Sequence, residues 1–433
     1  MKQKIIIKNF GPIEDVEMEI DDFTIFIGPQ TSGKSTIAKS VFFFLSLRDE
    51  LLTLLADSFN YNNVDDDLNH FKNSIIANFY AYWGGNNEIN LNMKFWYSDD
   101  CFISIENTPK LASIKISEKL TYFITGIIEF LKEQALILNE DKGKFLNSKE
   151  LSIKSSQKSQ ILYELQNQIN DIFGFEGDLL FIPAGRSILA ILSDQIPNIE
   201  VKHLDYLMRK FIERFNSLKG LMIDSDEYET DYFIKEGAFD NGTLDLMKEI
   251  SQFILQGSYY NDDEEGDKIR INVDKSIRLL FASSGQQEAV WIIQMIFLLM
   301  LNKEKVFIVI EEPEAHLFPE AQKNIISLIT LLANVNDNQV FITTHSPYLL
   351  TSLNNLVYAY QVGQKHPEKV SKIVDKQLWL NPEKLQAYFV GGKDNKGKIR
   401  SIIDPDLKII QAEEIDGASR MINQEFDQLF NLE

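Results

Sequence analysis

The sequence predicts an α/β fold in which parallel strands, joined by helices, carry a phosphate-binding loop at their carboxyl ends. The prediction depends on three mostly apolar runs, at residues 23–27, 306–310 and 340–344; the first is followed by a glycine-rich loop, and the other two by Glu311 and His345. Runs without polar alternation are typical of strands buried on both faces of a sheet. Helical sequence separates the second run from the third, so we expect parallel strands with ligands at their C-terminal ends.

The first apolar run continues into FIGPQTSGKST at residues 26–36, which matches the phosphate-binding loop pattern. Glycines permit the tight backbone path, and the loop N–H groups and the following helix N-terminus hold phosphate oxygens. Lys34 would place a positive charge on the outer phosphates, and the Ser35 hydroxyl is a hard ligand of the kind that Mg2+ takes. The candidate nucleotide-binding residues are Gly28, Pro29, Gln30, Thr31, Ser32, Gly33, Lys34, Ser35 and Thr36.

Composition limits the class of protein. A chain of 433 residues can hold two or three domains. It contains no stretch of about twenty apolar residues and no signal peptide at its start, so we expect no membrane span. Its one cysteine, Cys101, fits a reducing, cytoplasmic compartment. The net charge of −21 disfavours generic nucleic-acid binding; it suits a basic protein partner, or simply solubility.

We expect three regions. Residues 1–110 would form the N-terminal part of the α/β domain, with strands at 5–7 and 16–20, a loop helix to about residue 55, a polar loop at 60–69, and a hairpin at 89–107. Residues 111–280 would form a mainly helical insert that also contains a strand at 179–182 and a hairpin at 268–281. Residues 281–433 would complete the domain, with helices at 284–301 and 319–333, and add a short C-terminal extension.

Two smaller patterns lie in the helical insert. Phe123, Ile127, Phe130, Leu131 and Ala135 are expected on one face of a helix. The acidic run at residues 262–265 could bind a metal ion, but a solvated turn is the preferred interpretation.

Polar residues follow the two later strands where ligands are expected. Glu311 and Glu312 end the strand at 306–310, where one carboxylate could hold Mg2+ and the next could polarise an attacking water. His345 ends the following strand and could contact a phosphate. Earlier in the chain, Ser283, Ser284, Gly285 and Gln286 begin an apolar helix. They could form an anion site or an ordinary helix cap, and taken alone the cap is favoured.

Together these segments resemble the ABC-type ATPase heads of the SMC/RecF class. They are most similar to the OLD-like (overcoming-lysogenisation-defect) ATPases of prokaryotic anti-phage systems. The resemblance covers residues 1–55 and 280–355, and its motifs are IxNFGPIxD, GPQTSGKST, SSGQQ, IVIEEPEAHLFPEAQ and ITTHSPYLL. It implies an ABC-type head with an antiparallel β layer, an inserted helical region, and ATP with Mg2+ as ligands.

The resemblance also implies roles for residues. Residues 28–36 would be Walker A. Glu311 and Glu312 would be Walker B, with Glu311 on the metal side and Glu312 as the catalytic base. Residues 283–286 resemble the signature loop that contacts ATP on the opposite subunit of a homodimer, residues 314–319 the D-loop, and His345 the switch histidine.

The sequence departs from the family pattern in three places. Gln30-Thr31 replaces Asn-Gly, Ser284 replaces a glycine, and no Q-loop glutamine is evident. Pro183-Ala184-Gly185-Arg186-Ser187 resembles a motif of these defence ATPases. Its Arg186 could reach a phosphate or the dimer partner, or could form a structural ion pair.

In the family such heads control an effector, often a TOPRIM nuclease. After His345 about 90 residues remain, and their best metal-ligand candidate, Asp404-Pro405-Asp406, is better interpreted as a turn. We therefore expect the effector, a nuclease, to be a separate protein. A RecF-like DNA-repair ATPase is the alternative, and a transporter's nucleotide-binding subunit is a weaker one.

Overall fold

The fold is described from a computed structural model, which covers residues 2–61, 67–84, 90–108, 111–139, 148–192, 204–219, 241–262, 265–391, 397–411 and 417–430. The chain divides into two compact units by its internal contacts. Unit one contains residues 1–20, 39–179 and 396–398, and unit two contains residues 21–38, 180–395 and 399–433. The boundaries expected at residues 110 and 280 remain a prediction.

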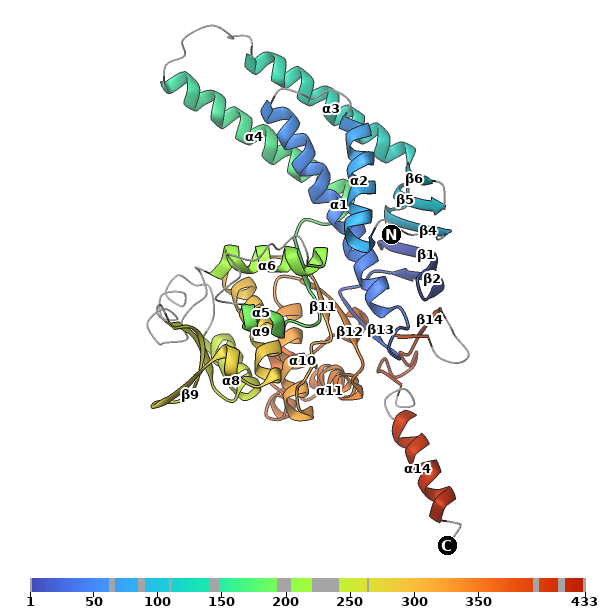
Figure 1. Ribbon diagram of the computed structural model, residues 1–433, viewed down its shortest axis with the longest axis vertical. Coiled ribbons are helices and arrows are strands. Elements are labelled where there is room, and N and C mark those ends of the chain that lie inside the picture. The colour runs from blue at the N-terminus through green and yellow to red at the C-terminus, as the bar shows by residue number, and fades with distance from the viewer. Residues whose placement is uncertain are drawn as a thin grey trace. The chain divides into compact units, whose positions relative to one another are not determined.

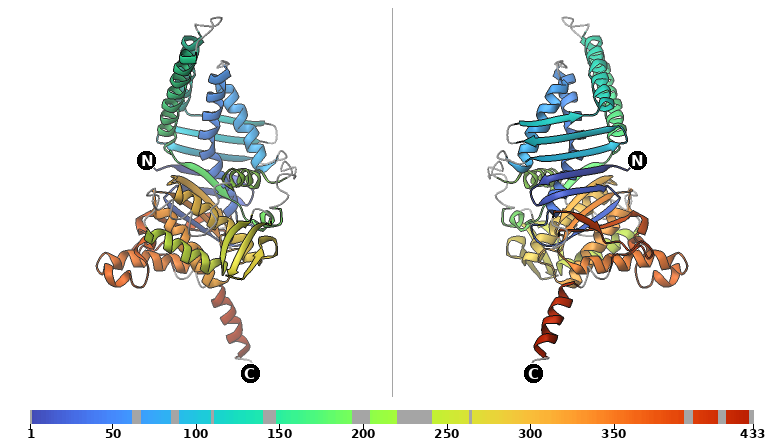
Figure 2. Two further views of the ribbon diagram at one scale, coloured as in Figure 1. Left: turned by 90° about the vertical axis from the view of Figure 1, so that its left-hand side faces the viewer. Right: turned by 90° about the vertical axis from the view of Figure 1, so that its right-hand side faces the viewer.

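Unit one contains the expected antiparallel layer, a five-stranded sheet with strand order β2-β1-β4-β5-β6 (Figure 2). Its strands are β1 (Lys4–Phe10), β2 (Ile13–Glu19), β4 (Leu91–Ser98), β5 (Cys101–Thr108) and β6 (Leu111–Ile116). Alternate residues of β4 are buried, as expected of a sheet with one covered face. The predicted hairpin turning at Asp99-Asp100 is confirmed. The expectation of helix from residue 111 was wrong at its start, because β6 pairs with β5.

Four helices accompany this sheet: α1 (Lys34–Tyr61), α2 (Asp67–Trp83), α3 (Glu118–Asn139) and α4 (Ser148–Phe173) (Figure 1). α1 begins in unit two and continues into unit one. The loop expected at residues 60–69 was wrong at both edges, since α1 reaches Tyr61 and α2 starts at Asp67; residues 62–66 lie outside the described part. In α3, Ile127, Leu131 and Ala135 are buried as predicted, but Phe130 is 41% exposed.

Unit two is built on a six-stranded sheet with strand order β14-β13-β3-β12-β11-β7. Its strands are β3 (Phe23–Ile27), β7 (Asp178–Ile182), β11 (Val306–Glu311), β12 (Gln339–Thr344), β13 (Leu385–Val390) and β14 (Ile399–Ser401). β3 pairs in parallel with both β12 and β13, and β12 pairs in parallel with β11. This confirms the predicted α/β fold, with the C-terminal ends of its central strands at one edge.

Helices pack on this sheet in one hydrophobic core. They include α5 (Ser187–Leu192), α6 (Tyr206–Lys219), α8 (Asn241–Leu255), α9 (Ser284–Leu301), α10 (Pro319–Asn334) and α11 (Pro347–Gly363), several of which are labelled in Figure 1. Outside this core, α12 (Pro367–Val370) packs through Val370 in a small separate cluster, and α14 (Gly417–Phe430) is a helix whose described side chains are exposed. α9 is buried on nearly all sides, which explains its almost continuous apolar sequence. The predicted hairpin is part of a small sheet of β8 (Ser258–Asp262), β9 (Gly266–Asn272) and β10 (Lys275–Arg278).

Acidic residues of both segments considered as metal ligands have partners within the chain. In the run at 262–265, Asp262 and Glu265 both pair with Lys268, while residues 263 and 264 lie outside the described part. Asp404 Oδ1 accepts hydrogen bonds from the N–H groups of Asp406 and Leu407, which is the geometry of a turn. Within the described residues, no helix is long and apolar enough to cross a membrane.

Candidate nucleotide site

The residues expected to bind and hydrolyse a nucleotide follow three neighbouring strands. β3, β12 and β11 lie side by side in that order and run in parallel. The phosphate-binding loop follows β3, His345 follows β12, and Glu311 ends β11. The strand ends therefore bring together three segments that are more than 30 residues apart in sequence.

The loop has the backbone path that the motif requires. Gly33 has φ +106°, and a Cβ on Gly28 would lie 2.2 Å from the carbonyl oxygen of Val390, at the end of β13. The end of β13 therefore packs directly against the start of the phosphate-binding loop, a contact that the sequence did not reveal. Thr31 has φ +59°. A β-branched residue is strained in that region.

Lys34 is buried and bonded to its own loop. Its Nζ donates to the carbonyl oxygens of Gly28 at 2.8 Å and Pro29 at 2.7 Å. Burial lowers the pKa of Lys34 to about 8, although the nearby carboxylates of Glu312 and Glu314 favour its charged form. Ser35, the next residue, is exposed, as a ligand of a bound ion should be.

The two acids after β11 have different environments. Glu311 is buried; its Oε2 accepts a 3.4 Å hydrogen bond from Ala184 N, and its Oε1 has no hydrogen-bond partner among the described residues. Glu312 adopts φ +45°, and its N–H donates to Thr343 O at 2.8 Å. Its side chain is 40% exposed, and its Oε1 lies 3.4 Å from His345 Nε2. One carboxylate is thus enclosed and the other faces solvent.

Glu314 is a third acid at this edge, which was not identified from the sequence as a site residue. Its Oε1 accepts hydrogen bonds from Thr344 Oγ1 at 2.6 Å and from His345 N at 2.7 Å. Its Oε2 is buried without a hydrogen-bond partner in the described part of the chain. Its sequence signals were its position two residues after Glu312 and its place at the start of the D-loop-like segment 314–319.

Arg186 resolves the alternatives left open above in favour of the ion pair. The side chain is fully buried, and its Nε lies 3.2 Å from Glu288 Oε2. Its guanidinium also donates to the carbonyl oxygens of Pro183, Glu311 and Glu312. Arg186 therefore contacts the backbone behind the acid pair.

The segment 283–286 forms the helix cap that its residues favoured. Ser283 and Gln286 form a capping box, in which Ser283 Oγ accepts from Gln286 N and Gln286 Oε1 accepts from Ser283 N. Gly285 packs against the segment after β11, since a Cβ there would lie 2.7 Å from His316 O. Gly285 and His316 border a pocket of about 570 Å³, together with Leu317 and Phe318. These contacts involve the D-loop-like segment, and none of them reaches Lys34.

The donor set fits a divalent cation and phosphates. In the cluster of charges that interact with Lys34 and Arg186, these two side chains contribute +2, and Glu288, Glu311, Glu312 and Glu314 contribute −4, which leaves −2. Two buried carboxylate oxygens, on Glu311 and Glu314, lack partners among the described residues. Oxygen ligands of this kind suit Mg2+. Ser35 and Glu311 would hold the ion, and the loop with Lys34 would hold the phosphates.

Comparison with known protein families decides the assignment, because the AAA ATPase domain family matches residues 1–350. The chain belongs to this family. Family membership supports nucleotide binding and ATPase activity in general. Among curated proteins, no sequence matches the chain.

Solved structures with weak similarity to this AAA ATPase domain protein include two SMC heads and RecF. An SMC head bound to the C-terminal winged-helix domain of ScpA is 13% identical, with a TM-score of 0.41, covering 92% of this chain and 96% of that one. The SMC head domain from Thermotoga maritima is 9% identical, with a TM-score of 0.37, covering 93% and 98%. The recombination mediator RecF is 11% identical, with a TM-score of 0.34, covering 92% and 97%.

Proposed function

We propose that the protein is an ABC-type, Mg2+-dependent ATPase that works as a homodimeric nucleotide switch controlling a separate effector. One observation supports ATP hydrolysis most strongly: Lys34, Glu312 and His345 all lie at the ends of three adjacent parallel strands. Lys34 is further linked to this cluster by its electrostatic interaction with Glu312 and Glu314.

Hydrolysis would use the residues as follows. The Lys34 ammonium leaves the carbonyls of Gly28 and Pro29 and binds the outer phosphates of ATP. Water attacks the γ-phosphorus, the bond to the ADP oxygen breaks, and the proton of the attacking water passes to Glu312. His345 contacts both the Glu312 carboxylate and the γ-phosphate and keeps the two groups oriented toward each other. Ser35 and Glu311 would hold a Mg2+ ion, which when bound would neutralise charge on the phosphate oxygens.

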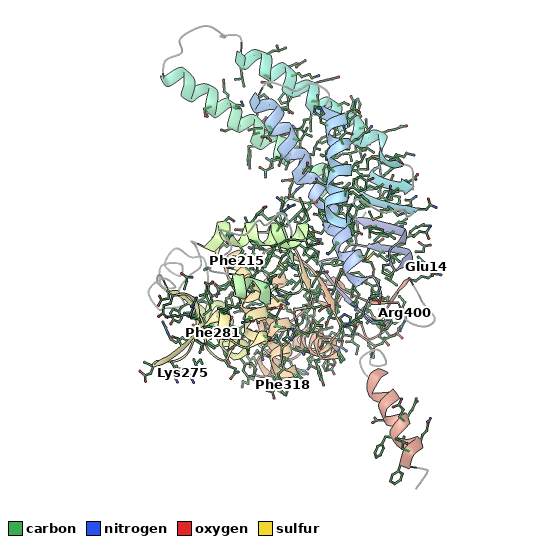
Figure 3. The ribbon with its side chains drawn as sticks, in the orientation of Figure 1. Glu14, Phe215, Lys275, Phe281, Phe318 and Arg400 are labelled. Carbon is green, nitrogen blue, oxygen red and sulfur yellow. The ribbon has the colours of Figure 1, made fainter. Side chains whose placement is uncertain are left out.

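A homodimer would complete each site. Two large apolar side chains flank the signature-like segment 283–286: Phe281 is 73% exposed and Phe318 is 72% exposed (Figure 3). The segment is held rigidly by its capping box. Burying these rings against a second copy would place 283–286 over the partner's ATP, as the resemblance implies.

The role as a switch in anti-phage defence is based on the order of motifs and on the acidic surface. A separate effector, proposed to be a nuclease, must prefer one nucleotide state, since equal affinity for both states would transmit nothing. The Asp404 carboxylate binds backbone amides of its own turn, which is a structural role.

The test uses two variants that fix the nucleotide state. Glu312→Gln should retain ATP, and Lys34→Ala should remain empty. Each is used as bait in a pull-down from the native host, and the purified wild type is incubated with plasmid, Mg2+ and ATP. We expect a protein recovered by one variant only, and intact plasmid. Metal-dependent cleavage by the pure chain, lost in Asp404→Ala, would contradict the separate effector. ATP turnover that rises with DNA would favour the alternative of a RecF-like repair ATPase.

A further inference from the structure

Arg186 makes three hydrogen bonds to backbone carbonyls in addition to its ion pair with Glu288. Its guanidinium donates to Pro183 O at 2.7 Å, to Glu311 O at 2.7 Å and to Glu312 O at 3.0 Å. Burial lowers the pKa of this group, while the carboxylates of Glu288, Glu314, Glu311 and Glu312 all favour its charged form. A planar fork with five N–H donors can serve such a set, and a lysine ammonium cannot.

The backbone that Arg186 contacts is strained at Glu312, the proposed catalytic base. Glu312 has φ +45°, a conformation that non-glycine residues rarely adopt. It is fixed on both sides: its N–H donates to Thr343 O on β12, and its carbonyl oxygen accepts from Arg186 Nη2. Strained residues persist only where the surrounding structure over-determines them. Arg186 supplies one of these fixed points, and Ala315 N, which also donates to Glu312 O, supplies another.

The same side chain also contacts α9. Glu288 accepts hydrogen bonds from the backbone N–H groups of Arg186 at 3.1 Å and Ser187 at 3.0 Å, and its carbonyl oxygen accepts from Arg186 Nε at 3.3 Å. Glu288 lies one turn after Gly285 on this helix. α5, α9 and β11, which meet at Arg186, are labelled in Figure 1.

A second set of contacts joins the Glu312 backbone to the start of α9. The segment after Glu312 forms two turns, in which Ala315 N donates to Glu312 O and Leu317 N donates to Glu314 O. His316, at φ +59°, then lies against Gly285 at the start of α9. The backbone of Glu312 and the N-terminus of α9 are therefore joined twice, through Arg186 and Glu288 and through the turns.

We propose that Arg186 is a positioning residue that holds the strained Glu312 backbone and couples it to the start of α9. This inference is built on the proposed function, in which Glu312 is the general base and residues 283–286 contact ATP. Arg186 would not bind nucleotide itself, because its side chain is fully buried behind the acid pair. Its loss should therefore affect turnover much more than ATP binding.

The kinetic test uses Arg186→Lys and Glu288→Gln, with Arg48→Lys as the matched control. Arg48 is also a buried arginine that donates to two backbone carbonyls, those of Phe175 and Gly177, but it lies in unit one. Both test variants should bind an ATP analogue within about 3-fold of wild type, with kcat reduced at least ~10-fold, since small displacements of a catalytic group are costly. In a Glu312→Gln background, Arg186→Lys should cause no further loss. Arg48→Lys should retain kcat.

A second readout does not need turnover. In both test variants, amide hydrogen exchange should rise at residues 283–288 and 311–318 and stay unchanged at 23–36. If the wild type does not hydrolyse ATP, the proposed function fails and the exchange data still decide the role of Arg186. If Arg186→Lys does not fold, Glu288→Gln carries both readouts. Lost ATP binding, an additive loss in the Glu312→Gln background, or exchange unchanged at either segment would overturn the proposal.

Discussion

The Nε2 of His345 lies 3.4 Å from the Oε1 of Glu312, although 33 positions separate the two residues in sequence. The contact exists because β11 and β12 are parallel neighbours, with Glu311 paired in register with Thr343. Each side chain is partly exposed, at 33% and 40%, so both can reach a ligand at the strand ends. The pair supports the proposal that Glu312 is a base oriented by His345.

Replacing the base should separate binding from turnover. We expect Glu312→Gln to bind ATP and to hydrolyse it at least ~100-fold more slowly, because general-base catalysis contributes on that scale. Phosphate release under saturating Mg2+ and ATP measures it. Normal turnover in Glu312→Gln together with an inactive Glu311→Gln would mean that the roles of the two acids are reversed.

ATP affinity should depend on pH through Lys34. Because the folded pKa of Lys34 is lowered to about 8, the free protein loses this proton as pH rises past that value. Phosphate binding needs the ammonium, so affinity should be flat below pH 8 and fall between about pH 8 and 9.5, with proton uptake on binding. Calorimetry in buffers of different ionisation enthalpy measures both effects. Lys34→Arg, which stays charged, should lose this dependence; the same slope in that variant would contradict the assignment.

The linked stability effect has the opposite sense. Between pH 8 and the ordinary value of 10.5, the unfolded chain binds more protons at Lys34 than the folded chain does. The Lys34 contribution to the free energy of unfolding should therefore rise with pH across that window. Urea denaturation of wild type and Lys34→Met at pH 7.5 and 9.5 would reveal it. A Lys34 contribution that falls with pH would show that this pKa is not lowered.

Glu314 should matter through His345. Its carboxylate accepts hydrogen bonds from Thr344 Oγ1 and His345 N, so Glu314→Gln should displace the histidine and weaken both bonds. One charged hydrogen bond is worth about 1.5 kcal/mol, which corresponds to a roughly tenfold loss of kcat. Glu383→Gln, at an exposed acid on the surface, is the control. Equal kcat in the two variants would exclude this role.

Much of the candidate site could be predicted from the sequence because its parts are local. The apolar run before Gly28, the acids after residue 310 and His345 after residue 344 each mark a strand end, and the parallel sheet joins them. The rest depends on distant pairing. β13 lies beside β3, more than 350 residues away, and nothing in its alternating sequence indicates that neighbour. The bonds of Glu314 and Arg186 likewise depend on packing between elements.

The proposed dimer predicts complementation between two defective chains. Lys34→Ala leaves the segment 283–286 intact, and Ser283→Arg/Gly285→Arg leaves the phosphate-binding loop intact. A heterodimer should contain one complete composite site, so each heterodimer should have about half of the wild-type turnover. A 1:1 mixture that exchanges at random is half heterodimer and should therefore recover about a quarter of the wild-type turnover per dimer. Absence of rescue, with heterodimers demonstrated by differently tagged chains, would count against a shared site.

The central claim is that the loop after β3 and the acids after β11 form one Mg2+-dependent ATP site. Calorimetric titration of ATP with Mg2+ into wild type, Glu312→Gln and Lys34→Ala tests it most directly. The account predicts similar affinities for the first two proteins, no detectable binding to Lys34→Ala, and loss of hydrolysis in both variants. ATP binding to Lys34→Ala with the affinity of the wild type would contradict it.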